Sequence, residues 1–268
     1  MTRTALSLVA LLITAAAASA LTGTEIIAQA QARNGFSTWH DRRSVVTLEN
    51  VEEGSGRTSE AEVFEKTDPH GEQRTLIVFL SPTDRKGTRL LHVSPHGSRD
   101  QWWWWSPATR HVRKLGGTAG GLQRDEVFVG RDVGYADLET LIRIQQWGDA
   151  DATTTQDGEE ACGDGRTCYR LTLQPAKGND EFPYTRYRLW FDRNDLLLRK
   201  AELDDRGDQL MKTVTCEGYF ATGRFMTARS CTIVHVNGTR ATITVREVAY
   251  DTGLGDDLFT IAHLGEGS

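Results

Sequence analysis

The second half of the sequence contains short segments in which apolar and polar residues alternate, and this pattern restricts the possible folds more than any other feature. Residues 169–173 and 187–191 show the alternation most clearly. A period of two is typical of a β-strand with one buried face. Asn237-Gly238 lies between two further strand-like segments and is typical of a tight hairpin turn. The pattern therefore predicts a sheet of successive antiparallel strands.

The first half of the sequence continues the same pattern. Residues 44–51 and 60–65 alternate, whereas residues 75–80 (TLIVFL) are apolar throughout, as in a strand buried on both faces. We count about 11–12 strands at short intervals, with turn-forming residues between them. Such regular short strands are typical of a meandering antiparallel sheet.

Two helices are predicted beside the strands. Residues 22–25 (TGTE) have the form of a capping box, and the helix that follows is predicted to end at Gly35. The second helix is predicted at 134–145. Asp132 and Asp137 are placed to cap its first turn and to complement the helix dipole. The fold class is therefore mainly β with a few helices (α+β).

No repeat or linker divides the chain, so we predict a single domain over residues 21–268. The acidic segment 148–165 is predicted to be a loop. Residues 116–121 (GGTAGG) are also predicted to be a flexible loop, because they lack the Lys-Ser/Thr ending and the following helix of a phosphate-binding loop.

Residues 1–20 have the features of a signal peptide. Arg3 supplies the positive charge, residues 5–17 are an apolar run too short to span a membrane comfortably, and Ala18-Ser19-Ala20 is an A-x-A cleavage site. We predict cleavage after Ala20 and a soluble, extracytoplasmic mature chain. A retained N-terminal membrane anchor is the alternative.

The four cysteines are Cys162, Cys168, Cys216 and Cys231. An even number of cysteines in an exported chain indicates disulfides, although the sequence leaves their connectivity open. We favour the two local pairs, Cys162 with Cys168 and Cys216 with Cys231. Zinc is the competing use of four cysteines, but no C-x2-C spacing occurs. We therefore predict no metal and no cofactor.

Four consecutive tryptophans stand in the segment Gln101–Leu115. In a strand, Trp102 and Trp104 would share one face and Trp103 and Trp105 the other. One interpretation places one pair in the core and covers the other with a helix or loop. The functional interpretation places one pair on the wall of an apolar ligand cavity.

The sequence contains no recognisable catalytic motif, neither G-x-S-x-G nor H-E-x-x-H. His92 and His96 would share a face only on a helix, whereas their segment LLHVSPH is typical of a strand that leads into a turn. The formal net charge of −6 argues against a nucleic-acid partner. These observations favour a binding protein over an enzyme, with a hydrolase as a remote alternative.

Five short motifs occur in order along the chain: 79–82 (FLSP), 86–91 (KGTRLL), 104–114 (WWSPATRHVRK), 127–138 (VFVGRDVGYADL) and 257–260 (DLFT). In this order they resemble the outer-membrane lipoprotein-sorting protein family, the LolA-like periplasmic carriers. The resemblance covers nearly the whole mature chain. The sequence departs from the family at Arg131, where the family usually has Ser, in its four tryptophans and in its cysteine pairs.

The resemblance implies a half-open, strongly curved antiparallel β-barrel whose concave face is covered by helices and holds acyl chains. A sheet too curved to pack on itself needs side chains or a ligand inside. The family pattern keeps an aromatic residue at the Trp105 position and often another at Trp103, so we expect this pair to line the cavity. The expected lining residues are Ile26, Ile27, Val78, Leu80, Leu90, Trp103, Trp105, Phe128, Leu138, Leu141 and Ile142. The family motifs imply structural roles for Pro82, Gly87, Pro107, Gly130, Asp132, Tyr135 and Asp137.

The function that the resemblance implies is that of a carrier or chaperone for a lipid or a lipidated protein on its way to the outer membrane. The implied partners are that ligand, an inner-membrane transporter and an outer-membrane acceptor. The alternative is a protein-binding envelope sensor or an accessory subunit of a membrane transporter.

Overall fold

The computed structural model of the chain describes residues 21–34, 39–52, 55–94, 100–115, 127–129, 133–134, 137, 152–176 and 182–266. The signal peptide predicted at 1–20 and the glycine-rich loop predicted at 116–121 lie outside these residues. No helix among the described residues is long and apolar enough to cross a membrane. A single domain over 21–268 stays a prediction.

Short strands make up most of the described chain, in agreement with the alternating sequence pattern. In chain order the elements are α1 (Gly23–Asn34), β1 (Asp41–Glu52), β2 (Ser55–Thr67), β3 (Gln73–Ser81), β4 (Arg89–Ser94), β5 (Gln101–Trp105), β6 (Val112–Leu115), β7 (Val127–Val129), β8 (Val133–Gly134), β9 (Ala152–Ala161), β10 (Thr167–Pro175), β11 (Arg186–Asp192), β12 (Leu198–Asp204), β13 (Leu210–Glu217), β14 (Phe220–Thr222), β15 (Phe225–Thr227), β16 (Ser230–His235), β17 (Arg240–Tyr250), η1 (Asp256–Phe259) and α3 (Ile261–Gly265).

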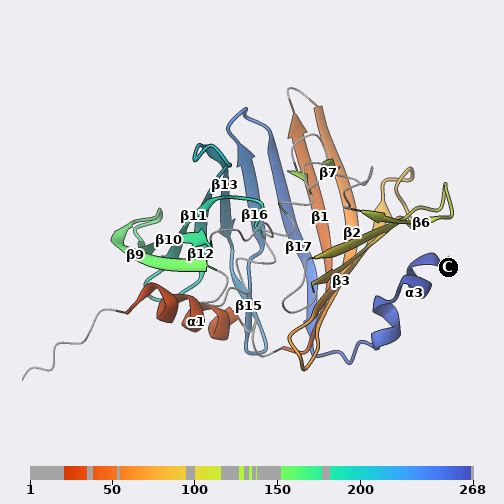
Figure 1. The fold of residues 1–268 in the computed structure, drawn as a ribbon, viewed down its shortest axis with the longest axis horizontal. Coiled ribbons are helices and arrows are strands. Elements are labelled where there is room, and N and C mark those ends of the chain that lie inside the picture. Colours follow the sequence, from red (N-terminus) through yellow and green to blue (C-terminus); the bar gives the residue numbers. More distant parts are fainter. Residues whose placement is uncertain are drawn as a thin grey trace, which may run out of the picture.

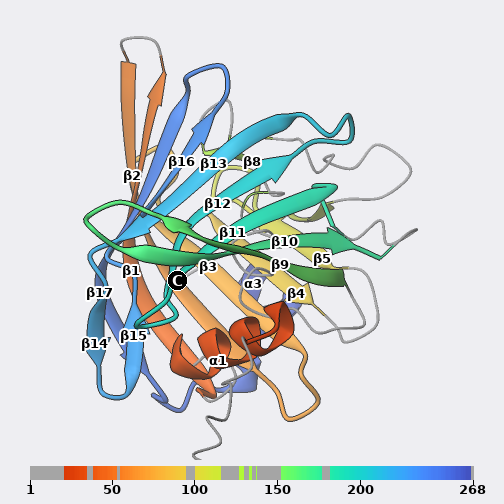
Figure 2. The same ribbon diagram turned by 90° about the vertical axis from the view of Figure 1, so that its left-hand side faces the viewer.

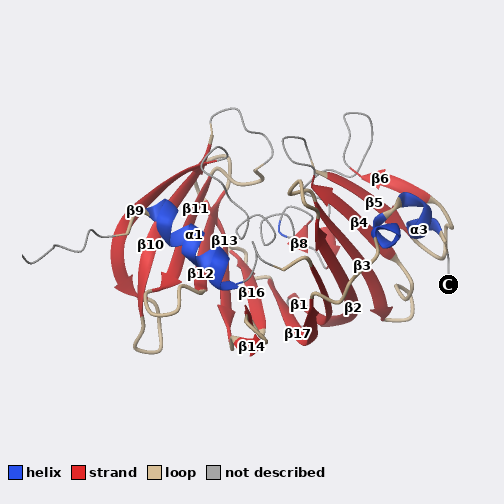
Figure 3. Cartoon of the chain, turned by 90° about the horizontal axis from the view of Figure 1, so that it is seen from below, coloured by secondary structure: helices blue, strands red, loops and turns tan. Residues whose placement is uncertain are grey.

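A 13-stranded sheet in the order β6-β5-β4-β3-β2-β1-β17-β16-β13-β12-β11-β10-β9 dominates the fold. Strands β1 to β6 form one meander, and β9 to β13, β16 and β17 form the other half. The antiparallel pairing of β1 with β17 joins the two halves. The sheet curves so that its halves face each other, and its edge strands β6 and β9 stay apart (Figures 1 and 3). The predicted fold class, a strongly curved, unclosed antiparallel sheet with few helices, is confirmed.

The prediction of a loop at 148–165 is wrong for most of the residues in this range that the structure describes. Residues Ala152–Ala161 form β9, an edge strand that pairs only with β10 among the described strands. Most of its side chains are exposed and many are polar or acidic. The strand therefore lacks the alternation of apolar and polar residues that identifies a half-buried strand in a sequence. This strand adds to the expected 11–12 and brings the sheet to its 13 strands.

Helix α1 begins with the predicted capping box. The Glu25 carboxylate accepts a hydrogen bond from the Thr22 backbone N–H at 2.8 Å, and the Thr22 hydroxyl accepts one from the Glu25 N–H at 3.2 Å. Ile26, Ile27 and Ala30 are buried against the half of the sheet that contains β10 to β13. The helix thus covers part of the inner face of the sheet, which we call the concave face (Figure 2).

The C-terminal segment covers the opposite, convex face of the other half. Phe259 of η1 and Leu264 of α3 are buried with Leu76, Leu91 and Trp105 of β3, β4 and β5. In Figure 1, α3 lies outside the curve of the sheet, beside β3 and β6. The motif residues 257–260 thus lie at η1, whose Phe259 is docked on the sheet.

Asp41 fixes the start of this C-terminal segment to β1. Its buried carboxylate accepts hydrogen bonds from the backbone N–H and hydroxyl of Thr252 and from the N–H groups of Gly253 and Leu254. Burial raises the pKa of Asp41, but the hydrogen bonds outweigh burial and leave the pKa below its usual value. The carboxylate is therefore ionised at neutral pH and holds the segment in place.

The second predicted helix, 134–145, falls mostly outside the described residues. Gly134 ends strand β8, and Asp137 is helical and buried. The remaining positions of this helix stay a prediction.

Candidate functional site

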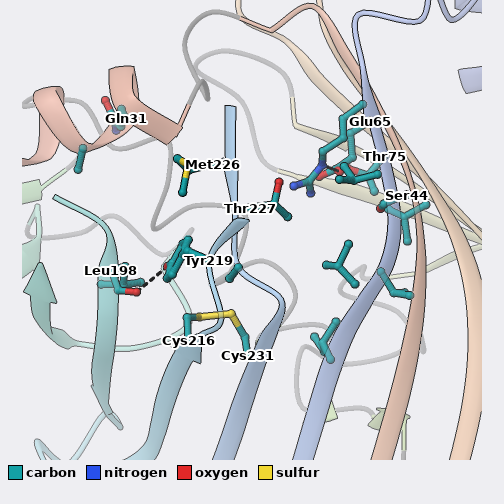
Figure 4. A pocket seen from close by; sticks show the side chains of 18 of the residues that line it. Gln31, Ser44, Glu65, Thr75, Leu198, Cys216, Tyr219, Met226, Thr227 and Cys231 are labelled. Carbon is teal, nitrogen blue, oxygen red and sulfur yellow. Dashed lines mark hydrogen bonds and ion pairs between the residues drawn. A yellow bond between two sulfur atoms is a disulfide. The ribbon is translucent and has the colours of Figure 1, made fainter. Parts of the chain in front are cut away.

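A pocket of about 220 Å³ lies on the concave face, between the two halves of the sheet (Figure 4). One wall is formed by β1, β2, β3, β5 and β17, and the facing wall by α1, β11, β12, β13, β16 and the β14–β15 hairpin. The lining residues are Ile27, Ala30, Gln31, Arg42, Ser44, Val46, Leu48, Val63, Glu65, Thr75, Ile77, Trp102, Phe191, Leu198, Cys216, Tyr219, Met226, Thr227, Ala228, Cys231, Ile243, Val245 and Val248.

The apolar part of the pocket follows from strand alternation. Val46 and Leu48 point to the same face of β1, and the paired strand β17 presents Val245 opposite Val46 and Ile243 opposite Leu48. Each inward position in this part of the two strands is therefore aliphatic. The wall that results offers apolar contact without hydrogen-bonding groups.

A row of polar side chains crosses the concave face at one end of the pocket. The sheet register places Arg42 of β1 beside Glu65 of β2, and Glu65 beside Thr75 of β3. The row continues to His92 of β4 and Trp102 of β5, whose rings stack with their centroids 4.0 Å apart. The pocket therefore has one polar end and an otherwise apolar lining.

Arg42 and Glu65 form an ion pair within the pocket wall. Burial lowers the pKa of the Arg42 guanidinium, but the Glu65 carboxylate and the Tyr250 hydroxyl outweigh burial and hold the pKa above its usual value. The cation also lies over the Trp39 ring, 5.9 Å from its centroid. The charges of this pair cancel locally, so the polar end has hydrogen-bonding groups without a net charge.

The facing wall of the pocket is reinforced by a disulfide and a buried phenol. Cys216 of β13 and Cys231 of β16 are directly opposite each other in the sheet and are bonded. The Tyr219 hydroxyl donates to the Leu198 carbonyl at 2.6 Å, and burial raises the pKa of Tyr219. The hydroxyl is therefore protonated at neutral pH and holds the loop before β14 against β12.

Both predicted disulfides are present. Cys162 is bonded to Cys168 beside β9 and β10, and Cys216 to Cys231 in the pocket wall. The cysteines are therefore not free to bind zinc. In the part of the chain that the structure describes, no group of three or more His, Cys, Asp or Glu side chains is arranged to hold a metal ion.

The structure places the predicted lining residues in four different environments. Ile27 lines the pocket, while Ile26 and Leu90 are buried in the core clusters beside it. Val78 packs on the convex face, and Leu80 is 36% exposed, so both expectations are corrected. The side chains of Phe128, Leu138, Leu141 and Ile142 lie outside the described residues.

The expected tryptophan pair is also corrected. Trp103 and Trp105 belong to the cluster on the convex face, where Phe259 and Leu264 of the C-terminal segment cover them. Trp102 lines the pocket and, with Trp104, belongs to the cluster on the concave face. One tryptophan pair forms the apolar surface on which the C-terminal helix docks, and the other pair lies on the concave face, where Trp102 forms part of the apolar cavity wall. Strand alternation shows that the two pairs lie on opposite faces, but it does not show which face holds the cavity.

Two of the family-motif residues, Gly87 and Pro107, are in close contact. Gly87 has a φ of +80°, which favours glycine, and a Cβ atom there would lie 3.2 Å from the Pro107 ring. Pro82 follows a cis peptide bond in the turn before Gly87. The turn after β3 therefore packs closely on the turn after β5. Gly130, Asp132 and Tyr135 have no described side chains.

Asp137 forms a buried ion pair, and its predicted role at the start of the second helix stays a prediction. Its buried carboxylate accepts hydrogen bonds from Lys212 Nζ at 2.8 and 2.7 Å and from the Tyr184 hydroxyl at 2.7 Å. Lys212 belongs to β13, on the same face as the pocket residue Cys216. This ion pair holds Asp137 over the concave face of the sheet.

Sequence reasoning missed most of the pocket wall. Ile243 and Val245 lie in a segment recognised only as a strand, and Arg42 and Glu65 are charged residues that point inward. The alternation in 44–51 was the available signal, since Ser44, Val46 and Leu48 share one face. No sequence signal marked the charged pair, because charged residues are expected on the outer face.

Comparisons with known proteins agree with this architecture. A protein-family model described as that of an uncharacterized protein matches residues 71–266. An outer membrane lipoprotein-sorting protein domain from Vibrio parahaemolyticus is 20% identical, with 91% of this chain and 98% of that chain covered and a TM-score of 0.79. A DUF1329 family protein from Desulfovibrio piger is 25% identical, with 89% and 97% covered and a TM-score of 0.78.

A third solved structure has the same fold at lower similarity. A LolA superfamily protein from Nitrosomonas europaea is 16% identical, with 91% of this chain and 100% of that chain covered and a TM-score of 0.66. No curated protein matches the sequence. The matches extend over nearly the full length of each of the three solved structures.

Proposed function

We propose that the chain, which belongs to the family whose model matches residues 71–266 and has the fold of a lipoprotein-sorting domain and a LolA superfamily protein, is a periplasmic carrier that holds acyl chains in the pocket on its concave face. The observation that carries the proposal is the position of the pocket. It lies between the two halves of an unclosed sheet and is lined largely by aliphatic and aromatic side chains. An apolar ligand would replace the side-chain core that a closed barrel would have at this place.

Burial of an acyl chain supplies enough free energy for reversible holding. Each buried methylene contributes about 0.8 kcal/mol. About ten methylenes would therefore match the roughly 8 kcal/mol of a micromolar complex, before the cost of immobilising the ligand. The pocket of about 220 Å³ is smaller than a typical site for a drug-sized ligand. We infer that it holds part of one chain and that the rest lies along the concave face.

The proposed location is the periplasm. Its support is the signal peptide predicted at residues 1–20, together with two disulfides, which persist in oxidising compartments. The proposed ligand is a lipid or a lipidated protein on its way to the outer membrane. An inner-membrane donor and an outer-membrane acceptor are the proposed partners.

Filling the pocket is expected to abolish binding of apolar ligands. Replacing Ile243 by tryptophan would put a larger side chain into the aliphatic wall opposite Leu48. We expect the dissociation constant of the uncharged fluorescent probe N-phenyl-1-naphthylamine to rise at least about tenfold, equivalent to about 1.4 kcal/mol. Fluorescence titration of the purified protein measures the change.

The matched control for this variant is Val51→Trp. Val51 lies on β1 but is 51% exposed and does not line the pocket. This variant is expected to bind the probe as the wild type does. Equal affinity of wild type and Ile243→Trp would show that the probe binds elsewhere and would contradict the proposal.

A further inference from the structure

Two nearly buried residues present hydroxyl groups to the polar end of the pocket, and neither hydroxyl has a hydrogen-bonding partner among the residues that the structure describes. Ser44 and Thr75 both line the pocket, and they are only 4% and 6% exposed. No described residue donates a hydrogen bond to either hydroxyl or accepts one from it. A buried hydroxyl without a partner loses free energy, so such groups usually bond to another polar group, to water or to a ligand.

The two hydroxyls lie on the concave face of the sheet, in neighbouring rows of side chains that run across the strands. Ser44 pairs with Val63 across β1 and β2, and Thr75 pairs with Glu65 across β2 and β3. Figure 4 shows Ser44, Thr75 and Glu65 gathered at the same end of the pocket, away from the Cys216–Cys231 disulfide. We call Arg42, Ser44, Glu65 and Thr75 the polar subsite.

The charges of the polar subsite decide which polar group it fits. Glu65 already neutralises Arg42, and its carboxylate is almost fully buried. A second carboxylate in the same pocket would lie near Glu65, in surroundings where like charges repel strongly. An uncharged acceptor such as a carbonyl oxygen can take a hydrogen bond from either hydroxyl without this cost.

We propose that the polar subsite binds the ester or amide carbonyl through which an acyl chain is joined to its head group. This inference rests on the proposed function. The hydroxyl of Ser44, which is next to Val46 on the same face of β1, or that of Thr75 two strands away donates to the carbonyl oxygen, and the chain itself lies along Val46, Leu48, Ile243 and Val245. The subsite therefore selects esterified or amide-linked chains, the form present in lipids and lipidated proteins, over free fatty acids.

The test compares methyl laurate with laurate at pH 8, where laurate is ionised, by displacement of N-phenyl-1-naphthylamine. The wild type is expected to bind the ester at least about tenfold more tightly than the acid. The double variant Ser44→Ala/Thr75→Val keeps the size of the side chains nearly unchanged but removes both hydroxyls. We expect it to bind the ester about tenfold more weakly, the effect of one to two net hydrogen bonds.

The uncharged probe is the internal reference, and the ester affinity of each protein is expressed relative to the affinity of the same protein for the probe. Thr58→Val, an exposed position on β2, is the matched substitution outside the pocket and should change neither affinity. An unaltered melting temperature of the double variant would confirm that it is folded.

Each contrary result has a distinct meaning. If the probe binds but the ester affinity is equal in wild type and double variant, the polar subsite is wrong and the carrier proposal stands. Tighter binding of laurate than of the ester would show that Arg42 receives a carboxylate, and this would also overturn the subsite. If the wild type binds neither probe nor ester, the proposed function itself fails.

Discussion

Replacing Lys212 by methionine is expected to lower the free energy of unfolding by about 3–5 kcal/mol. Lys212 Nζ lies 2.8 and 2.7 Å from the two carboxylate oxygens of Asp137, and the two residues are only 7% and 1% exposed. Methionine fills similar space but removes the cation that pairs with the buried Asp137 carboxylate. The loss therefore reflects an uncompensated buried charge.

Urea denaturation of wild type and variant measures this difference. Arg57→Met is the matched control, because the Arg57–Asp84 ion pair is equally short, at 2.8 Å, but more than half exposed on both sides. Its removal is expected to cost less than about 1 kcal/mol. The double variant Lys212→Met/Asp137→Leu removes both charges and is expected to recover part of the loss. Equal effects of Lys212→Met and Arg57→Met would contradict the role of this ion pair.

Replacing Cys216 and Cys231 together by serine is expected to lower the free energy of unfolding by about 3 kcal/mol. The disulfide closes a loop of 15 residues between two adjacent strands, so its removal gives the unfolded chain more conformations. Both cysteines also line the pocket, and the loss of the crosslink therefore weakens the wall that faces β1 and β17.

The other disulfide provides the comparison. Cys162 and Cys168 are only 6 residues apart, and the same loop argument gives about 2 kcal/mol for replacing both by serine. These positions lie outside the pocket, so that variant should keep its affinity for an apolar probe. Identical melting of the wild type under oxidising and reducing conditions would refute a stabilising role for either disulfide.

The fold was largely predictable because one face of most strands is buried. Tyr187 and Leu189 are buried in β11 and alternate with the half-buried Arg186 and Arg188. The capping box at Thr22 and the turn at Asn237-Gly238 are local signals that need no tertiary information. Strand β9 was missed for the opposite reason, since an exposed edge strand has no apolar alternation.

The site was less predictable, because it depends on which strands lie side by side. The row that contains Arg42 is completed by Tyr250, more than two hundred positions away in the sequence. Whether Trp102 or Trp105 faces the pocket depends on where the C-terminal helix docks. Alternation identifies the residues that share a face, but only the register and the covering segments decide which face encloses the ligand.

The central claim is that the pocket on the concave face carries an acyl chain. Native mass spectrometry of protein purified from the periplasm, followed by denaturation and identification of released lipid, tests it most directly. We predict an acylated ligand that leaves on denaturation and is absent from the Ile243→Trp variant. A wild-type protein that is free of ligand and takes up none from an extract of envelope lipids would contradict the claim.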